Sequence, residues 1–169
     1  MERDADIAEE VLTSIRQIVR RISEHSKFLT REVGLTVPQL MCLKAIGELE
    51  ELEEEITVNM VSARVQLAPA TASRILDRLV RGGLVTRERR SRDRRRVCLS
   101  LTPAGLERFQ TLPTPLQERF ISRLRALPDH ERQQLLAALR KIVSLMDASK
   151  LDAAPILAPG LDVKDEAPR

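Results

Sequence analysis

The chain has 169 residues, of which 43% are apolar and 31% charged. This length and balance are typical of a soluble globular protein with one main core, and they exclude a disordered or collagen-like chain. The aromatic residues are three phenylalanines, with no Tyr or Trp. Binding of single-stranded nucleic acid depends on bases stacking on aromatic rings, so this composition argues against that function.

The formal charge of +3 is unevenly distributed along the chain. Arginine accounts for 23 of the 28 basic residues, and residues 64–96 contain eleven arginines against three acidic residues. This segment therefore carries +8 and the rest of the chain −5. A basic block on an otherwise acidic protein is typical of a surface that binds a polyanion. Six glutamates between Glu48 and Glu55 would repel the same partner, and we expect them to lie on a solvated face away from it.

Neither a membrane segment nor a metal site is predicted. The first ten residues, MERDADIAEE, are too acidic and polar for a signal peptide, and no apolar run approaches the ~18 residues that a membrane helix needs. Cys42 and Cys98 are far apart, and the chain has only two histidines, which argues against a zinc site. We therefore expect a cytoplasmic protein without a metal or cofactor.

The N-terminal segment 6–32 shows the apolar spacing of one long amphipathic helix. Gly34 is suited to end this helix, and Thr36 with Pro38 to begin a second one. A long apolar stripe needs a partner, and the segment is predicted to be a dimerisation helix. The stripe comprises Ile7, Val11, Ile15, Ile18, Ile22 and Leu29.

The segment 57–82 predicts two short helices joined by a tight turn. Thr57 can cap the first helix, and Pro69 is favourable in the first turn of the second. The second helix has an apolar face and a face of small and basic residues, and Gly82–Gly83 ends it. This pattern is typical of a helix-turn-helix.

Two strand-like runs follow, 84–89 and 97–101, and they enclose an arginine-rich loop. A hairpin with such a tip is a wing, so residues 36–101 are predicted to form a winged helix-turn-helix. Residues 102–148 predict C-terminal dimerisation helices that are interrupted at Pro113 and Pro115. Residues 151–169 lack a sustained period and are predicted to be a flexible tail. The expected fold class is mainly α with a small β wing.

Three stretches resemble the MarR family of winged-helix transcriptional regulators. They are LAPATASRILDRLVRGGLV at residues 67–85, RSRDRRRVCLSLTPAG at 90–105, and GLTVPQL at 34–40. The resemblance covers residues 7–148 and implies a dimeric, prokaryotic regulator, expected here to be a repressor whose DNA affinity responds to a small molecule or to oxidation. The first helix, with His25 and Ser26, is similar to that of regulators of ectoine and other compatible-solute genes. Ala68 departs from the family, which usually has Ser or Thr there to cap the recognition helix.

The recognition helix is expected to enter the major groove of double-stranded DNA, at a pseudo-palindromic operator. Arginines on its exposed face can pair with guanine or hold phosphate, and a Thr methyl or Ala can touch a thymine methyl. We expect Asp77 to orient Arg74 or Arg81. The predicted contact residues of this helix are Pro69, Ala70, Thr71, Ser73, Arg74 and Arg78.

The wing is expected to contact the minor groove. Residues 93–95 match the Asp-x-Arg element of the family, which implies that Arg95 inserts into the groove and that Asp93 holds its guanidinium. A narrow A·T-rich groove favours such an insertion, and the other wing arginines are expected to contact phosphates. The predicted wing contacts are Arg89, Arg90, Arg92, Asp93, Arg94, Arg95 and Arg96.

The family further implies an effector site where the terminal helices meet the winged helix. The polar and aromatic residues expected there are Arg16, His25, Ser26, Phe28 and Arg64. For His25, packing inside the protein is the simpler interpretation.

Three alternatives stay open. Cys42 or Cys98 could sense oxidation, although both fall in apolar patterns that favour inert packing. The winged helix could instead bind another protein, although its basic wing favours DNA. An enzyme is not expected, since the sequence contains no P-loop, GxGxxG, HExxH or GxSxG motif.

Overall fold

The computed structural model describes residues 2–88, 97–151 and 153–159, with side chains from residue 6 onward. These residues form helices and one two-stranded antiparallel sheet, which confirms the expected fold class. In chain order the elements are α1 (Glu2–Phe28), the π-helical turn η1 (Leu29–Val33), α2 (Val37–Glu50), α3 (Val58–Val65), α4 (Pro69–Arg81), β1 (Val85–Glu88), β2 (Cys98–Leu101), α5 (Pro103–Gln110), α6 (Leu116–Arg125) and α7 (Asp129–Leu145).

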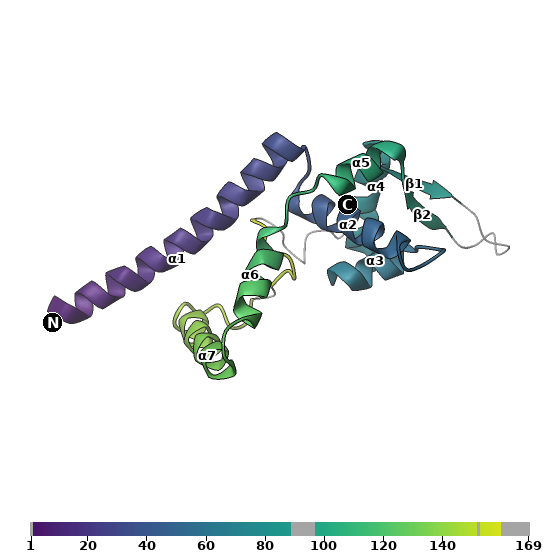
Figure 1. Cartoon of the computed structure of the whole chain (residues 1–169). Helices are drawn as coiled ribbons and strands as arrows, with labels where there is room; N and C mark the ends of the chain where they lie inside the picture. The colour runs from purple at the N-terminus through teal and green to yellow at the C-terminus, as the bar shows by residue number, and fades with distance from the viewer. Residues whose placement is uncertain (1, 89–96, 152, 160–169) are drawn as a thin grey trace.

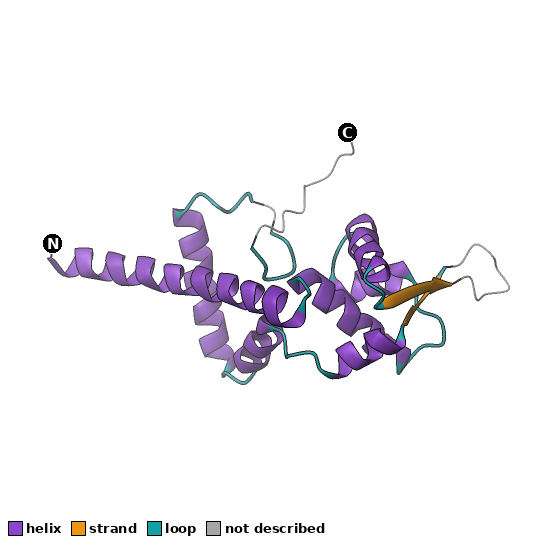
Figure 2. Cartoon of the chain, turned by 90° about the horizontal axis from the view of Figure 1, so that it is seen from above, coloured by secondary structure: helices purple, strands orange, loops and turns teal. Residues whose placement is uncertain are grey.

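The winged helix occupies one end of the molecule and the terminal helices the other (Figure 1). Helix α1 is a long rod that extends away from α2–α5, and α6 leads from the winged helix to α7. Seen from above, α1 again projects far beyond the rest of the chain (Figure 2). The wing sheet lies at the opposite end of the molecule from the free end of α1.

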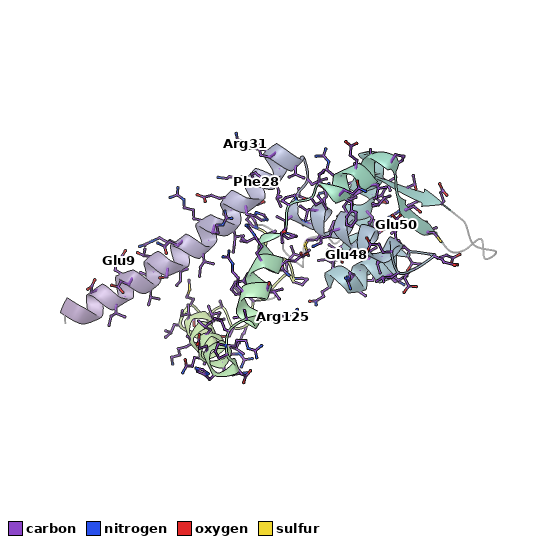
Figure 3. All side chains as sticks on the ribbon, viewed as in Figure 1. Glu9, Phe28, Arg31, Glu48, Glu50 and Arg125 are labelled. Atoms are coloured by element: carbon purple, nitrogen blue, oxygen red, sulfur yellow. The ribbon has the colours of Figure 1, made fainter. Side chains whose placement is uncertain are left out.

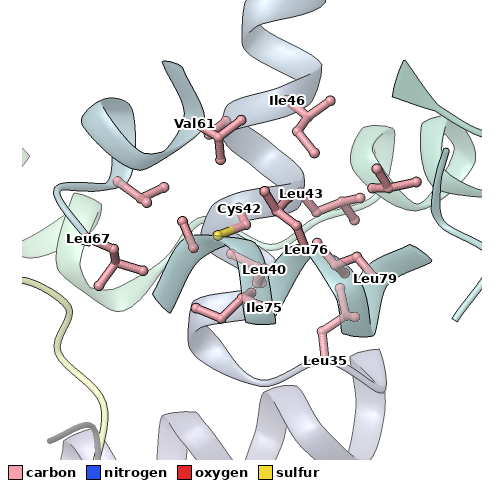
Figure 4. Packing of buried hydrophobic residues seen from close by; sticks show 14 of the residues in the cluster. Leu35, Leu40, Cys42, Leu43, Ile46, Val61, Leu67, Ile75, Leu76 and Leu79 are labelled. Atoms are coloured by element: carbon pink, nitrogen blue, oxygen red, sulfur yellow. The ribbon is translucent and has the colours of Figure 1, made fainter. Parts of the chain in front are cut away.

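The main hydrophobic core lies between α2, α3 and α4 (Figure 4). Leu43 of α2, Val61 of α3 and Leu76 of α4 are each completely buried. The apolar face that the sequence predicts for α4 therefore packs inward, and its other face is left toward solvent.

Side-chain caps fix where several of these helices begin. The hydroxyl oxygens of Thr36, Thr57 and Thr102 accept hydrogen bonds from the backbone N–H groups of Gln39, Met60 and Gly105, respectively. Ala68 at the start of α4 makes no side-chain cap, as its side chain predicts. The first turn of α4 is stabilised instead by Pro69 and by packing against the core.

Strands β1 and β2 pair from Val85 with Leu101 to Glu88 with Cys98. Two contacts join this sheet to the helices. Ile56 forms an isolated bridge with Leu99, and a carboxylate oxygen of Glu50 accepts a hydrogen bond of 2.7 Å from the Leu101 N–H. The base of the wing is therefore held by residues that lie before α3 in the chain.

The C-terminal segment differs from the expectation of a flexible tail. The Ile156 side chain is only 3% exposed and belongs to the main hydrophobic cluster. Gln117 of α6 makes hydrogen bonds with both the Pro155 carbonyl and the Leu157 N–H. The sequence did not predict these contacts of residues 153–159, because a single apolar side chain and a distant glutamine produce no periodic pattern.

Candidate nucleic-acid interface

The predicted contact residues of α4 lie on its solvent side. Pro69, Ala70 and Arg78 are exposed, while Thr71, Ser73 and Arg74 are half-buried. The opposite face of the same helix is buried through Ala72, Ile75, Leu76 and Leu79. This division leaves a face of small and basic side chains of the size and chemistry that fit a major groove.

Arg87 of β1 fastens the wing to α4. Its guanidinium donates to a carboxylate oxygen of Asp77 at 2.7 Å, and to the backbone carbonyl and the hydroxyl of Ser73 at 3.2 and 3.3 Å. The contacts of Arg87 join β1 to α4, while Arg81 donates within α4 to the backbone carbonyl of Asp77 at 3.3 Å.

The partnership between Asp77 and Arg87 was not predicted from the sequence. A signal for it was present, because Arg87 lies two residues after Val85, and residues two apart point to the same face of a strand. Val85 is buried, so Arg87 shares the face of the sheet that packs on the helices. Ser73, predicted as a DNA contact, also accepts this internal hydrogen bond.

The wing-tip residues predicted to contact DNA lie outside the described residues; they are Arg89, Arg90, Arg92, Asp93, Arg94, Arg95 and Arg96. The structure describes the two strands that flank them, and Glu88 and Cys98 are paired across the hairpin. The two strand residues that flank this segment are thus side by side.

The five residues predicted to line an effector site do not lie together. Arg16 is far along α1, where it pairs with Glu9 at 2.5 Å on an exposed surface. Ser26 and the 48%-exposed Phe28 are near the end of α1, and Arg64 is on α3. Figure 3 shows Glu9 toward the free end of α1, Phe28 near the other end of that helix, and Glu48 on α2.

His25 has a structural role in this arrangement. Its side chain is 5% exposed, and its Nε2 atom accepts a hydrogen bond of 3.2 Å from the Leu116 N–H at the start of α6. Burial lowers the pKa of His25, and the positive charges of Arg119 and Arg21 lower it further. The neutral imidazole therefore joins α1 to α6, as the packing interpretation predicts.

Acid is expected to destabilise the fold through His25. In the unfolded chain its pKa returns to the ordinary 6.5, so the unfolded state takes up the proton first as the pH falls. The contribution of His25 to the free energy of unfolding is thus complete above pH 6.5 and is lost as the pH falls from there toward the lowered folded-state pKa. Urea denaturation at about pH 7.5 and about pH 5.5 measures this loss.

The matched variant for this measurement is His25→Gln, whose side-chain oxygen can still accept from Leu116 but does not titrate. All other titrating groups are shared by the two proteins. We expect the variant to lose less stability than the wild type over the same pH interval. Equal losses in the two proteins would contradict the role assigned to His25.

A cavity of about 630 Å³ lies between the winged helix and α6. Lys44 contacts the carboxylates of both Glu118 and Glu48, and Arg64 pairs with Glu48 at 2.7 Å. Arg125 of α6 makes no ion pair within the described part of the chain. The lining residues are Met41, Lys44, Ala45, Glu48, Arg64, Val65, Glu118, Ile121, Ser122 and Arg125. Of the predicted effector residues, this cavity includes Arg64.

Both cysteines are buried. Burial raises the pKa of the Cys42 thiol to about 12, so this residue is a neutral thiol at physiological pH. Because the thiolate is the form that reacts with oxidants, the environment of Cys42 favours inert packing.

No helix in the described part of the chain is both long enough and apolar enough to cross a membrane. Within the same ranges, no three His, Cys, Asp or Glu side chains gather as metal ligands.

Comparison with known proteins agrees with this architecture. The sequence model of the MarR family matches residues 33–96. The HTH-type transcriptional regulator YsmB of Bacillus subtilis is 28% identical over 131 residues, which cover 78% of this chain and 84% of YsmB. The organic hydroperoxide resistance transcriptional regulator of the same organism is 31% identical over 86 residues, covering 51% of this chain and 56% of that protein.

The fold is also similar to that of MepR in the crystal structure of the Staphylococcus aureus MepR–DNA complex. The TM-score is 0.55 at 21% identity, and the match covers 79% of this chain and 96% of MepR. This likeness concerns the fold, while the family match falls on the α2–α4 region and the wing. The chain is therefore similar to MarR-family transcriptional regulators, through the family model over residues 33–96 and through a regulator matched along most of its length.

Proposed function

We propose that this protein is a homodimeric repressor that binds a specific double-stranded DNA operator and releases it in response to a small molecule. The observation that carries the proposal is the junction of α4 and the wing. Arg87 bonds to Asp77 and Ser73 and so holds strand β1 beside the exposed face of α4. The same region contains the +8 block of the sequence.

In the proposed complex α4 lies in the major groove with Pro69, Ala70 and Thr71 at its leading end. Arg78 is exposed on this face and Arg74 half-buried, and each can approach a guanine edge or a phosphate. Ser73 positions Arg87 as well as lying on the contact face. We therefore assign base readout first to Arg74 and Arg78.

In the adjacent minor groove we place the wing tip. By resemblance to the family, Arg95 inserts and Asp93 holds its guanidinium, while Arg89, Arg90, Arg92, Arg94 and Arg96 contact phosphates. A single arginine in a narrow minor groove meets concentrated negative potential, whereas phosphate contacts position the protein without reading sequence.

Two apolar faces support a homodimer. Helices α6 and α7 have no fully buried residue, and α1 and α7 expose large apolar side chains to solvent. Such surface on one chain is typical of an interface between copies. The exposed apolar residues of these two helices are Ile7, Val11, Leu12, Ile18, Val19, Phe28, Leu135, Leu136, Leu139, Val143 and Leu145.

The cavity between the winged helix and α6 is the proposed effector site. It is large enough for a small molecule and is lined by charged side chains from both sides of the junction, including Lys44, Arg64 and Glu118. A ligand that separates Lys44 of α2 from Glu118 of α6 would change the angle between the recognition helices of the dimer. The relation to compatible-solute genes stays a prediction, which the identity of the regulated genes tests.

The decisive experiment recovers genomic DNA fragments bound by the purified protein. We expect a pseudo-palindrome with half-sites about 10 base pairs apart. The affinity should fall steeply with salt, because about 6–10 phosphate contacts release that many counterions. Recovery of no enriched fragment, with capture of a protein partner by the same surface, would instead support the protein-interaction alternative.

Replacing Arg95 by alanine is expected to weaken binding to the recovered operator by about 1–3 kcal/mol, which is the typical contribution of one good groove contact. The reason is the loss of the inserted guanidinium. Titration of labelled operator at fixed salt measures the change. Arg31→Ala is the matched control, since it removes the same charge from an exposed site outside the basic block. An affinity loss equal to that of the control would reject the groove contact.

A further inference from the structure

Three consecutive residues at the start of α6 each bind a different, distant part of the chain. The Leu116 N–H donates to His25 of α1. The Gln117 side chain binds residues 155–157, and the carboxylate of Glu118 contacts Lys44 of α2. We call residues 116–118 the α6 joint. The joint connects the terminal helices to the winged helix.

The segment 153–159, which we call the C-terminal strap, is held at this joint in the manner of a bound peptide. The amide Nε2 of Gln117 donates to the Pro155 carbonyl at 3.1 Å, and its Oε1 accepts from the Leu157 N–H at 2.9 Å. One side chain thus satisfies a backbone acceptor and a backbone donor on either side of a bend at residues 155–156, where the Ala158 N–H also donates to the Ile156 carbonyl at 2.9 Å. Between these two hydrogen bonds Ile156 is 97% buried.

The strap also contacts the core of the winged helix. Ile156 belongs to the same buried cluster as Leu43, Leu67 and Leu76, and Ala158 packs against this cluster. The strap follows α7, which has no buried residue of its own. The chain therefore leaves the winged helix through α6, turns at α7, and returns to the winged-helix core through Ile156 (Figure 1).

We propose that the C-terminal strap is an intramolecular clamp that fixes the α6 joint and so sets the orientation of the winged helix relative to the terminal helices. Without the strap, one hydrogen bond to His25 of α1 and one ion pair with Lys44 of α2 would hold the joint. Because each is a single polar contact, the joint could then pivot about them. The strap adds a third attachment that buries an apolar side chain, and apolar burial is little affected by the orientation of its neighbours or by salt.

The consequence for DNA binding rests on the proposed function. Two recognition helices in a dimer must match successive turns of one duplex. When the joint is fixed beforehand, less conformational freedom is lost on binding, and the affinity is higher. Release of the strap is therefore expected to weaken operator binding without reducing the number of phosphate contacts.

The test uses the full-length chain and two variants that release the strap by different means. Ile156→Asp places a charge where the apolar side chain is buried, and Gln117→Leu removes both hydrogen bonds while keeping a similar volume. The control is Leu157→Asp, the same chemical change one residue further on at a side chain that is 39% exposed. Amide hydrogen exchange is measured at Leu157 and Leu116, and the melting temperature of each variant shows whether it folds.

We expect both release variants to speed exchange at Leu157 and at Leu116 by about two- to twelvefold, since each net hydrogen bond contributes about 0.5–1.5 kcal/mol to local protection. Operator affinity should fall several-fold with an unchanged salt slope, and the control should resemble the wild type. Faster exchange at Leu157 alone would overturn the clamp, because the joint would then be independent of the strap. Faster exchange at both amides with unchanged operator affinity would overturn its role in DNA binding.

Failure of the proposed function is distinguishable from failure of the clamp. If the wild type binds no duplex, the DNA-binding proposal falls, whereas exchange at Leu116 still decides whether the strap fixes the joint. If Ile156→Asp does not fold, Gln117→Leu carries the measurement, because it introduces no charge into the core.

Discussion

Replacing Leu76 by alanine is expected to lower the free energy of unfolding by about 2–5 kcal/mol, the range for removing a large buried aliphatic side chain. Leu76 lies on the inward face of α4 and is completely buried, where it faces the leucines of α2 (Figure 4). The loss combines the transfer free energy of the missing atoms with the cost of the cavity they leave. The α2–α4 contact cannot close this cavity easily, because α4 is also fixed through Asp77 to the wing.

Urea denaturation at one protein concentration measures the Leu76→Ala change, since the stability of a dimer depends on concentration. The matched control is Leu52→Ala, because the Leu52 side chain is 71% exposed and its truncation should change the stability by at most about 0.5 kcal/mol. We also expect the Leu76 variant to lose DNA affinity, since α4 carries the proposed recognition face. A loss below about 1 kcal/mol would show that α4 is not packed as described.

The second large effect is expected at Gly105 in the first turns of α5. A Cβ atom there would lie 2.9 Å from the carbonyl carbon of Leu84 and closer still to its oxygen. That oxygen accepts the hydrogen bond of the Thr102 N–H at 3.1 Å. Both partners are backbone, so the clash cannot be relieved by a change of rotamer.

Gly105→Ala is therefore expected to destabilise the fold by about 2–4 kcal/mol, through overpacking and the loss of this hydrogen bond. Thermal unfolding should show a decrease of about 4–16 °C, at about 2–4 °C per kcal/mol for a chain of this size. Gly82→Ala is the control, because Gly82 has an ordinary right-handed conformation and the nearest atom to its added Cβ is 3.3 Å away. A Gly105 variant as stable as the control would contradict the close approach of α5 to Leu84.

The local structure of the winged helix follows closely from its sequence. Thr36 and Thr57 cap helices as predicted, and Gly34 ends the first helical segment in the left-handed conformation. Capping and glycine conformations depend on a few adjacent atoms, so short motifs predict them well. The end of the first helix differs from the prediction of one helix over residues 6–32. The α-helix ends at Phe28 and continues as a π-helical turn from Leu29, whose side chain is completely buried.

The candidate site was only partly predictable. The exposed face of α4 followed from periodicity, because one face of that helix is uniformly apolar. The contacts of Arg87 with Asp77 and Ser73 did not follow from periodicity, although all three residues lie within the basic segment 64–96. Arg87 is on a strand and its two partners are on a helix, so their contact depends on how the sheet packs on the helix.

The predicted effector residues were also not found together. The sequence predicts a shared site for Arg16, His25 and Arg64 because each is polar and near the expected junction of the terminal helices with the winged helix. In the structure they bind Glu9, Leu116 and Glu48, respectively. The cavity at the junction is formed mainly by α2 and α6, whose polar side chains have no pattern in the sequence that would group them.

The amino-acid order alone determined that this chain is a winged helix with a basic wing and long amphipathic ends, because periodicity, caps and charge density are local properties. Only the tertiary structure decided that the first turn of α6 gathers His25, Lys44 and the C-terminal strap, and that the strap is packed rather than free. These contacts join residues between 38 and 91 positions apart. At such separations the chain must fold before side chains meet, and no local preference of either partner encodes the pairing.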